Sequence, residues 1–320
     1  MKISSRYLLS AALLCCPLLA APHAADSPSP AAAASASPST SASTSDSALA
    51  GLKVHVATLP GTNDTHVRYV EQGSGATTLV FVHGWSCNRD FWRLQAPALQ
   101  EVKGLRAIYL DLPGFGQSDH PETAYTMGYL ADGVLAVMNQ AKVSKAVLLG
   151  HSMGTPVITR FYRDHPDRVQ ALVAVDGGLR GFKLEPAQIA QFVGRFKAPE
   201  YKSAIGGFVD AMFPNPGTEA LRDRTRAEMQ STPQHVIVSA MENMFDAPSW
   251  ETNRIDVPLL VLNAPNPMWS DDYKAYVKTL APRGDYRTID GTGHFVMLEK
   301  PSEFNAALLD FLKTSKLLAP

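Results

Sequence analysis

The 320-residue chain has few cysteines and no excess of either charge. It contains three cysteines, and 29 Lys and Arg residues stand against 30 Asp and Glu residues, for a formal net charge of -1. The basic residues are scattered along the sequence, so we expect no nucleic-acid partner. No grouping of His and Asp residues has the spacing of a metal site, and we expect neither a metal nor another cofactor.

Long apolar runs are also scarce. The run Tyr7 to Ala21 is short for a transmembrane helix and is interrupted by Pro17. Basic residues precede it and small residues follow it, which is the pattern of an export signal. We therefore predict a signal peptide over residues 1–25, a periplasmic or secreted mature protein, and no membrane span after cleavage. An uncleaved membrane anchor is the alternative.

The three cysteines leave no internal disulfide once this signal is removed. Cys15 and Cys16 lie inside the signal, so Cys87 is the only thiol of the mature chain. Residues 26–50 consist almost entirely of Ala, Ser, Pro and Thr and cannot bury enough apolar surface to offset the entropy of ordering. We predict a disordered tether over 26–50 and a folded domain over 51–320.

Within the folded part, short apolar runs alternate with longer helical segments. Two strands open the domain, at Leu52 to Thr58 and Val67 to Glu71. Continuous apolar runs of the kind found in strands covered on both faces follow at Thr78 to His83, Ala107 to Asp111, Ala146 to Gly150 and Ala171 to Asp176. Helices are expected between them at Phe91 to Glu101, Met127 to Ala141 and Thr155 to His165. This alternation predicts an α/β fold with a mostly parallel central sheet and helices on both faces.

The alternation stops at about residue 177 and resumes at about residue 253. Helical segments such as Glu185 to Phe196 and Glu219 to Gln230 fill this interval, which we interpret as a helical lid inserted into the core. Its large apolar residues could line an apolar substrate pocket: Phe182, Phe192, Phe196, Phe208, Met212, Phe213, Met241, Met244 and Phe245. The core pattern then continues with a strand at Leu259 to Leu262, a helix at Asp271 to Leu280, a strand near Tyr286 to Ile289 and a helix at Ser302 to Thr314.

Ser152 is the candidate nucleophile. It is the centre of Gly150-His151-Ser152-Met153-Gly154, between a predicted strand and a predicted helix. Glycines two positions to either side suit a sharp strand-to-helix turn, which projects the serine hydroxyl at the edge of the sheet. The alternative is a serine that merely caps the following helix.

Further motifs stand in the order and approximate spacing of a known family. They are Tyr69 to Gly73, Val82 to Trp85, Asp111 to Ser118 and Gly293-His294. With the serine turn, they make the chain resemble a lid-bearing member of the α/β-hydrolase fold superfamily over about residues 69–312. The resemblance implies an oxyanion hole formed by the backbone N–H groups of Trp85 and Met153. It says little about the substrate.

His294 is the candidate general base. A serine hydroxyl is a poor nucleophile until a base lies within hydrogen-bonding reach. His294 follows the last predicted strand in a loop with two glycines, and it alone among the nine histidines has a suitable position. His151 is expected to point away into the fold, and His83 is expected to be structural.

The acid of the triad departs from the family pattern. Members usually carry it just beyond the strand represented by Leu259 to Leu262, where this chain has Asn266. Some members use the end of the preceding core strand, and Asp176 stands there. We predict Asp176 as the acid, with Asp271 or Asp272 as alternatives. Asn266, or no acid at all, is a further possibility.

A serine at position 152 argues against haloalkane dehalogenases and epoxide hydrolases of this fold, which use an aspartate nucleophile. We therefore predict an exported serine hydrolase that cleaves a carboxylic ester or a related acyl bond of a small-molecule apolar acyl substrate through a Ser-His-acid triad and an acyl-enzyme, and most simply a carboxylesterase. The alternatives are a cofactor-free haloperoxidase or perhydrolase, an aminopeptidase, a carbon–carbon bond hydrolase, and an inactive ligand-binding protein. The oligomeric state is left open.

Overall fold

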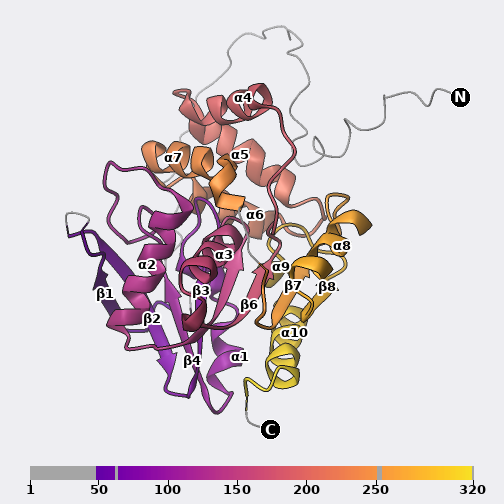
Figure 1. Cartoon of the computed structure of the whole chain (residues 1–320). Helices are drawn as coiled ribbons and strands as arrows, with labels where there is room; N and C mark the ends of the chain where they lie inside the picture. The colour runs from indigo at the N-terminus through magenta and orange to yellow at the C-terminus, as the bar shows by residue number, and fades with distance from the viewer. Residues whose placement is uncertain (1–47, 62–63, 251–253, 319–320) are drawn as a thin grey trace, which may run out of the picture.

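The computed structural model of the chain describes residues 48–61, 64–250 and 254–318 (Figure 1). The predicted signal peptide and nearly all of the predicted tether lie outside the described residues. Leu49, two residues before the expected boundary at residue 51, is buried in the core with 2% of its surface exposed. Within these ranges, no helix is both long and apolar enough to cross a bilayer.

The core is one eight-stranded sheet with strand order β1-β2-β4-β3-β5-β6-β7-β8. The strands are β1 (Val54–Thr58), β2 (His66–Gly73), β3 (Thr77–Val82), β4 (Leu105–Leu110), β5 (Ala146–His151), β6 (Val169–Val175), β7 (Leu259–Asn263) and β8 (Gly284–Thr288). Only β2 runs antiparallel to its neighbours β1 and β4, and the other pairs are parallel. The predicted mostly parallel sheet is confirmed.

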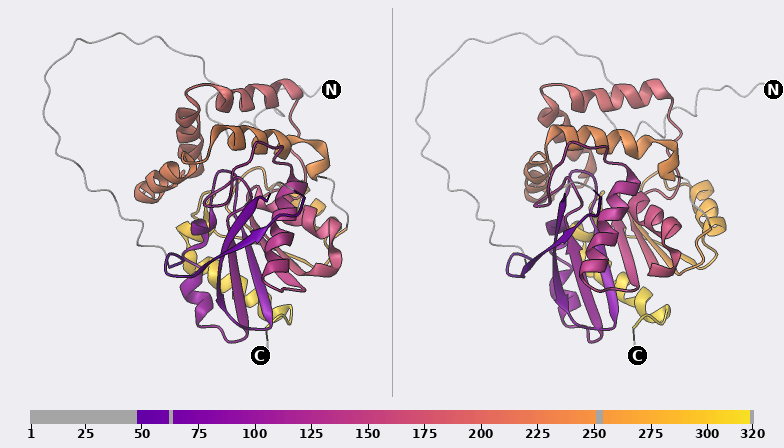
Figure 2. Two further views of the ribbon diagram at one scale, coloured as in Figure 1. Left: turned by 90° about the vertical axis from the view of Figure 1, so that its left-hand side faces the viewer. Right: turned by 60° about the vertical axis from the view of Figure 1, so that its left-hand side comes forward.

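Helices cover both faces of this sheet, as predicted. Figures 1 and 2 show α2 (Met127–Gln140) and α3 (Gly154–Asp164) on one face, and α1 (Ala96–Gln100) and α10 (Pro301–Thr314) on the other. The remaining core helices are α8 (Asp271–Leu280) and the short α9 (Val296–Glu299). The single helix expected over residues 91–101 is wrong: a 3-10 turn at Arg89–Trp92 is followed by a separate α1. Pro97 is the reason, because proline has no N–H to donate within a helix and is accommodated in the first turn of α1.

Four helices lie between β6 and β7, above the carboxyl ends of the strands (Figure 1). They are α4 (Pro186–Lys197), α5 (Tyr201–Met212), α6 (Glu219–Met229) and α7 (Gln234–Phe245), and we call them the lid. The sequence patterns singled out α4 and α6 but not α5 and α7. In the lid, α4 packs against both α5 and α7, while α5 also packs against α6.

Trp85 connects the lid to the core. It follows β3, it is buried, and its indole N–H donates a hydrogen bond of 2.9 Å to the carbonyl oxygen of Ile237 in α7. Its ring also packs edge-on against Phe196 and Phe208, with centroid separations of 4.9 and 5.6 Å. The lid is thereby fixed directly above the loop that leaves β3.

Candidate active site

Ser152 occupies a tight turn between β5 and α3. Its φ of 52° is in the left-handed region, which is uncommon for a residue with a side chain and stores local strain. Its backbone N–H donates to the Val175 carbonyl oxygen at 2.9 Å. A Cβ on Gly150 would overlap the Gly154 carbonyl, and a Cβ on Gly154 would lie 2.5 Å from the Val82 carbonyl oxygen. Glycine is therefore required at both positions for α3 to approach β3 and β5.

Asp176 directly follows β6 and faces His294. Its Oδ2 lies 2.7 Å from Nδ1 of His294, although 118 residues separate the two in the chain. Its Oδ1 accepts hydrogen bonds from the Ala264 backbone N–H at 2.9 Å and from the Trp269 indole N–H at 3.3 Å. Asp176 is 8% exposed. The loop after β7, where the family usually carries the acid, here provides two donors to a carboxylate from the neighbouring strand.

The other candidate acids have different surroundings. Asp271 is fully exposed and pairs with Lys274, while Asp272 pairs with Arg180. The Arg180 hydrogen bond lowers the pKa of Asp272. Both lie in the first turn of α8, where a negative charge interacts favourably with the helix dipole. Asn266 accepts a hydrogen bond from the Met268 N–H. Of these candidates, the structure brings Asp176 to His294.

The loop that carries His294 is fixed from two sides. The His294 N–H donates to the carbonyl oxygen of Met212, the last residue of α5, at 3.0 Å. Glu299 accepts the N–H groups on either side, from Gly293 at 2.8 Å and from Phe295 at 3.2 Å. Burial raises the pKa of Glu299, and these two amides oppose the rise. The sequence analysis missed Glu299 and named Met212 only as a candidate lining residue, and only the Glu299 spacing of five residues from His294 could have suggested a contact.

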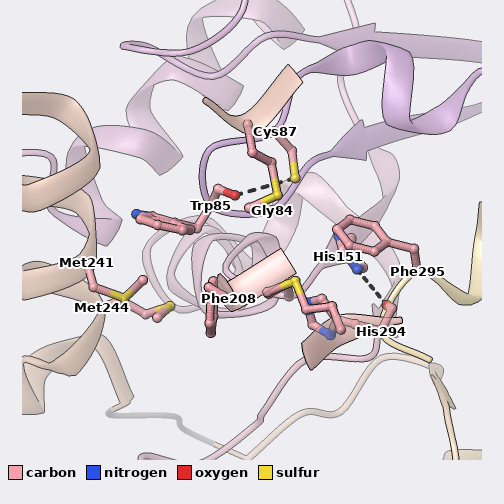
Figure 3. A pocket seen from close by; sticks show the side chains of 12 residues that line it. Gly84, Trp85, Cys87, His151, Phe208, Met241, Met244, His294 and Phe295 are labelled. Atoms are coloured by element: carbon pink, nitrogen blue, oxygen red, sulfur yellow. Dashed lines mark hydrogen bonds between the residues drawn. The ribbon is translucent and has the colours of Figure 1, made fainter. Parts of the chain in front are cut away.

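A small cavity lies between the lid and the serine turn, with a volume of about 30 Å³. That is space for roughly two water molecules. The core lines it with Gly84, Trp85, Cys87, His151, Ser152, His294 and Phe295, and the lid lines it with Phe208, Met212, Met229, Met241 and Met244. In Figure 3, Trp85, Phe208, Met241 and Met244 gather on one side, opposite His151, His294 and Phe295.

The prediction that large apolar lid residues line a pocket is therefore correct for some of the residues named. Phe208, Met212, Met241 and Met244 line the cavity, and Met229 is added to them. The other lid aromatic residues named above hold the lid together or attach it to the core. Phe213, for example, stacks on Phe295 with a centroid separation of 5.2 Å.

A family model described as alpha/beta hydrolase fold matches residues 77–301. The chain belongs to the α/β-hydrolase fold family. It is 28% identical over 287 residues to a 2-hydroxy-6-oxononadienedioate/2-hydroxy-6-oxononatrienedioate hydrolase of Paraburkholderia phymatum, covering 82% of this chain and 96% of that protein. It is 25% identical to the dihydrolipoyllysine-residue acetyltransferase component of an acetoin cleaving system of Cupriavidus necator, covering 76% of this chain but only 65% of that protein.

Solved structures share the fold of this α/β hydrolase. An esterase of Exiguobacterium antarcticum superimposes with a TM-score of 0.72 at 20% identity, covering 81% of this chain and 98% of that one. At this level of identity the likeness concerns the fold. The conclusion that the protein is a hydrolase rests on the family match.

Two further histidines of this α/β hydrolase lie near the serine turn. His83 is fully buried, and its Nε2 accepts the Leu112 N–H at 3.0 Å, so Nδ1 carries the proton and donates to the Gly84 carbonyl oxygen. Burial lowers the pKa of His83 to about 4, which agrees with a neutral structural role.

His151 was expected to point away from the site, and this is wrong in part. The residue is buried, but its ring lines the cavity and lies 4.7 Å from the His294 ring. Its Nε2 hydrogen-bonds the carbonyl oxygen of His294 at 3.0 Å, an interaction drawn in Figure 3. Burial lowers the pKa of His151 well below its usual value. His151 is therefore a neutral group that supports the same loop as Glu299.

Cys87 also lines the cavity of this α/β hydrolase. Its thiol contacts the Trp85 carbonyl oxygen at 3.4 Å, and burial raises the pKa of the thiol well above its usual value. A thiol held in its protonated form is a weak nucleophile. Among the described residues, no group of three His, Cys, Asp or Glu side chains could hold a metal ion.

Proposed function

We propose that this α/β hydrolase is an exported serine hydrolase that cleaves a carboxylic ester, or a related acyl bond, of a small apolar substrate. The observation that carries the proposal is the 2.7 Å contact between Asp176 Oδ2 and His294 Nδ1, with His294 and Ser152 in the wall of one cavity. Serine, histidine and buried carboxylate are the three groups that acyl transfer through a serine ester requires.

In the proposed reaction, the Ser152 Oγ attacks the carbonyl carbon while Nε2 of His294 takes the hydroxyl proton. Collapse of the tetrahedral intermediate breaks the ester bond, and His294 returns the proton to the leaving alcohol. Water then attacks the acyl-enzyme with His294 again as the base, releasing the acid and restoring the serine. Asp176 keeps the Nδ1 proton on the side away from Ser152 and stabilises the imidazolium.

The backbone N–H groups of Trp85 and Met153 are the proposed oxyanion donors. Within the part of the chain that the structure describes, neither N–H donates to a backbone carbonyl. Gly84 keeps the Trp85 loop close to the nucleophile, because a Cβ there would lie 3.1 Å from the Ser152 Cβ. Preorganised donors of this kind are worth about a hundredfold or more in rate each.

The lining of the cavity favours an apolar substrate group over a charged one. Its lid side is lined by Phe208 and four methionines, and no Lys or Arg is among its lining residues. A dioate, which the name of the Paraburkholderia phymatum relative specifies, would need cationic partners for its carboxylates. We therefore favour ester cleavage over carbon–carbon bond cleavage of such a substrate.

A fluorophosphonate probe tests the proposal directly. Folded wild-type protein is expected to be labelled at Ser152, and Ser152→Ala is expected to remain unlabelled. Absence of label on the folded wild-type protein would refute the serine hydrolase and favour a ligand-binding role. A series of chromogenic esters from acetyl to dodecanoyl then defines the acyl group.

Export is tested separately. Cell fractionation should recover the protein outside the cytoplasm, with a mature N-terminus near residue 26 by mass spectrometry. A full-length cytoplasmic product would contradict that part of the proposal and leave the catalytic part unaffected.

A further inference from the structure

Three consecutive backbone amides around His294 each have a defined acceptor. The Gly293 N–H donates to Glu299 Oε2, the His294 N–H to the Met212 carbonyl, and the Phe295 N–H to Glu299 Oε1. One carboxylate therefore spans the histidine and holds the residue on each side of it. Such a bridge restricts the backbone from which the imidazole projects toward the cavity.

Residues of the lid also pack closely against the His294 loop and leave its backbone little room to move. A Cβ on Gly293 would overlap the Met212 carbonyl oxygen and lie 2.7 Å from Pro214 Cδ. On the other side of the loop, the ring of Phe213 stacks on that of Phe295. Glu299 is thus the fixed partner from the core, and residues 212–214 are the fixed partner from the lid.

Glu299 also contributes charge near His294. Burial raises the pKa of Glu299, and the amide N–H on each of its oxygens and the charge of His294 oppose that rise by favouring the ionised carboxylate. The titratable groups that face the imidazole or its loop are Asp176 from β6, His151 from β5, Glu299 from α9, and Lys300, whose Nζ would lie 3.4 Å from a Cβ on Gly291. Since His151 stays neutral, the two carboxylates are the groups that can stabilise positive charge on His294.

We propose that Glu299 is a positioning residue for the general base. It holds the His294 loop by its two flanking amides and adds a second negative charge that favours the imidazolium. Its catalytic consequence rests on the proposed serine hydrolase function, whereas its effect on the imidazole can be measured without any activity.

Glu299→Gln is the primary test, with Glu303→Gln as the matched control. Glutamine has one oxygen, so at best one flanking amide keeps its acceptor and the negative charge is lost. Glu303 lies four residues further along in α10, more than half exposed, and pairs with Lys300. Fluorophosphonate labelling of Ser152 is expected to slow about ten- to a hundredfold in Glu299→Gln, with kcat reduced and KM little changed. Glu303→Gln should behave as wild type.

The second measurement is the NMR signal of the His294 Nδ1 proton, recorded at one pH and assigned by its loss in His294→Gln. In Glu299→Gln this signal is expected to shift, because the loop that carries the imidazole has lost an acceptor and the contact between Nδ1 and Asp176 changes with it. Glu299→Asp keeps the charge on a shorter side chain and should slow labelling to a smaller degree.

These outcomes separate the two proposals. An unshifted Nδ1 proton signal together with wild-type labelling in folded Glu299→Gln would overturn the role of Glu299. A folded wild-type protein that takes no label would overturn the serine hydrolase instead, and the Nδ1 signal would still decide whether Glu299 acts on His294. If Glu299→Gln does not fold, Glu299→Asp decides: labelling as fast as in wild type would overturn the proposal.

Discussion

The indole N–H of Trp269 donates a hydrogen bond to the Oδ1 of Asp176, with 3.3 Å between the two atoms. Together with the Ala264 amide, it orients the carboxylate so that the other oxygen faces His294. The loop after β7 therefore supports an acid that comes from β6. We therefore expect replacement of Asp176 and replacement of Trp269 to lower kcat to different extents.

Asp176→Asn is expected to lower kcat by about four orders of magnitude, by analogy with the same change in other serine triads. The amide would present an N–H to His294 Nδ1 and favour the wrong imidazole tautomer. Steady-state kinetics with a chromogenic ester measures the loss, and circular dichroism verifies the fold. Asp272→Asn, at the exposed partner of Arg180, is the control and should retain activity. Wild-type turnover in Asp176→Asn would show that another group is the acid.

Trp269→Phe removes one of the two donors to Asp176 and keeps the aromatic ring. We expect kcat to fall about tenfold, since a hydrogen bond to a charged group contributes about 1.5 kcal/mol or more. Tyr286→Phe, which loses a hydroxyl bound to the Asn263 side chain, should change kcat much less. Equal effects of the two replacements would mean that the Trp269 hydrogen bond is irrelevant to catalysis.

Gly84→Ala places a methyl group 3.1 Å from the Ser152 Cβ and 3.0 Å from His151 Nδ1. The serine must move by a few tenths of an ångström, and we expect kcat to fall about tenfold or more because reacting groups tolerate little displacement. Gly194→Ala is the contrasting control: its Cβ meets nothing within 4 Å in helix α4. There the free energy of unfolding should rise by about 0.5–1 kcal/mol, with unchanged kcat.

Met241→Ala should shift substrate preference toward longer acyl chains. The buried Met241 lines the cavity, so its loss adds space where each extra buried methylene contributes about 0.8 kcal/mol to binding. The ratio of kcat/KM for butanoyl over acetyl esters is expected to rise severalfold. Met138→Ala, in the buried face of α2, costs stability in the same way but should leave the ratio unchanged. A constant ratio in Met241→Ala would place the acyl group elsewhere.

The unfolding free energy should decline as pH falls from about 6.5 to about 4. In this interval the unfolded chain protonates His83, while burial lowers the pKa of the folded residue to about 4, so the unfolded state binds more protons. One such group contributes at most about 1.4 kcal/mol per pH unit. Urea unfolding at several pH values across this interval should show that the unfolding free energy depends less steeply on pH in His83→Gln than in His55→Gln. The side chain of His55 is partly exposed.

Much of the fold could be predicted because each buried strand corresponds to a short apolar run in the sequence. Strands β3, β5 and β6 contain continuous apolar runs, Leu79 to Val82, Ala146 to Leu149 and Ala171 to Val175, which are typical of strands buried on both faces. The lid was harder to divide into helices. Helix α5 contains Gly206 and Gly207, and α7 has three consecutive β-branched residues, Val236 to Val238, all of low helix propensity.

The sequence by itself determined the candidate nucleophile and the candidate base, because a serine turn needs glycines at fixed local spacing and a loop with two glycines follows the last strand. Ser152 and His294 follow from such short-range rules. The sequence could rank Asp176 above Asp271 and Asp272 only through the family resemblance, since the acid is defined by its proximity to the imidazole. Tertiary structure decided that Asp176 faces His294, that Trp269 orients Asp176, and that Glu299 and Met212 hold the His294 loop. Those contacts join β6, the loop after β7, α9 and the lid, and no local pattern encodes an approach between segments so far apart in the chain.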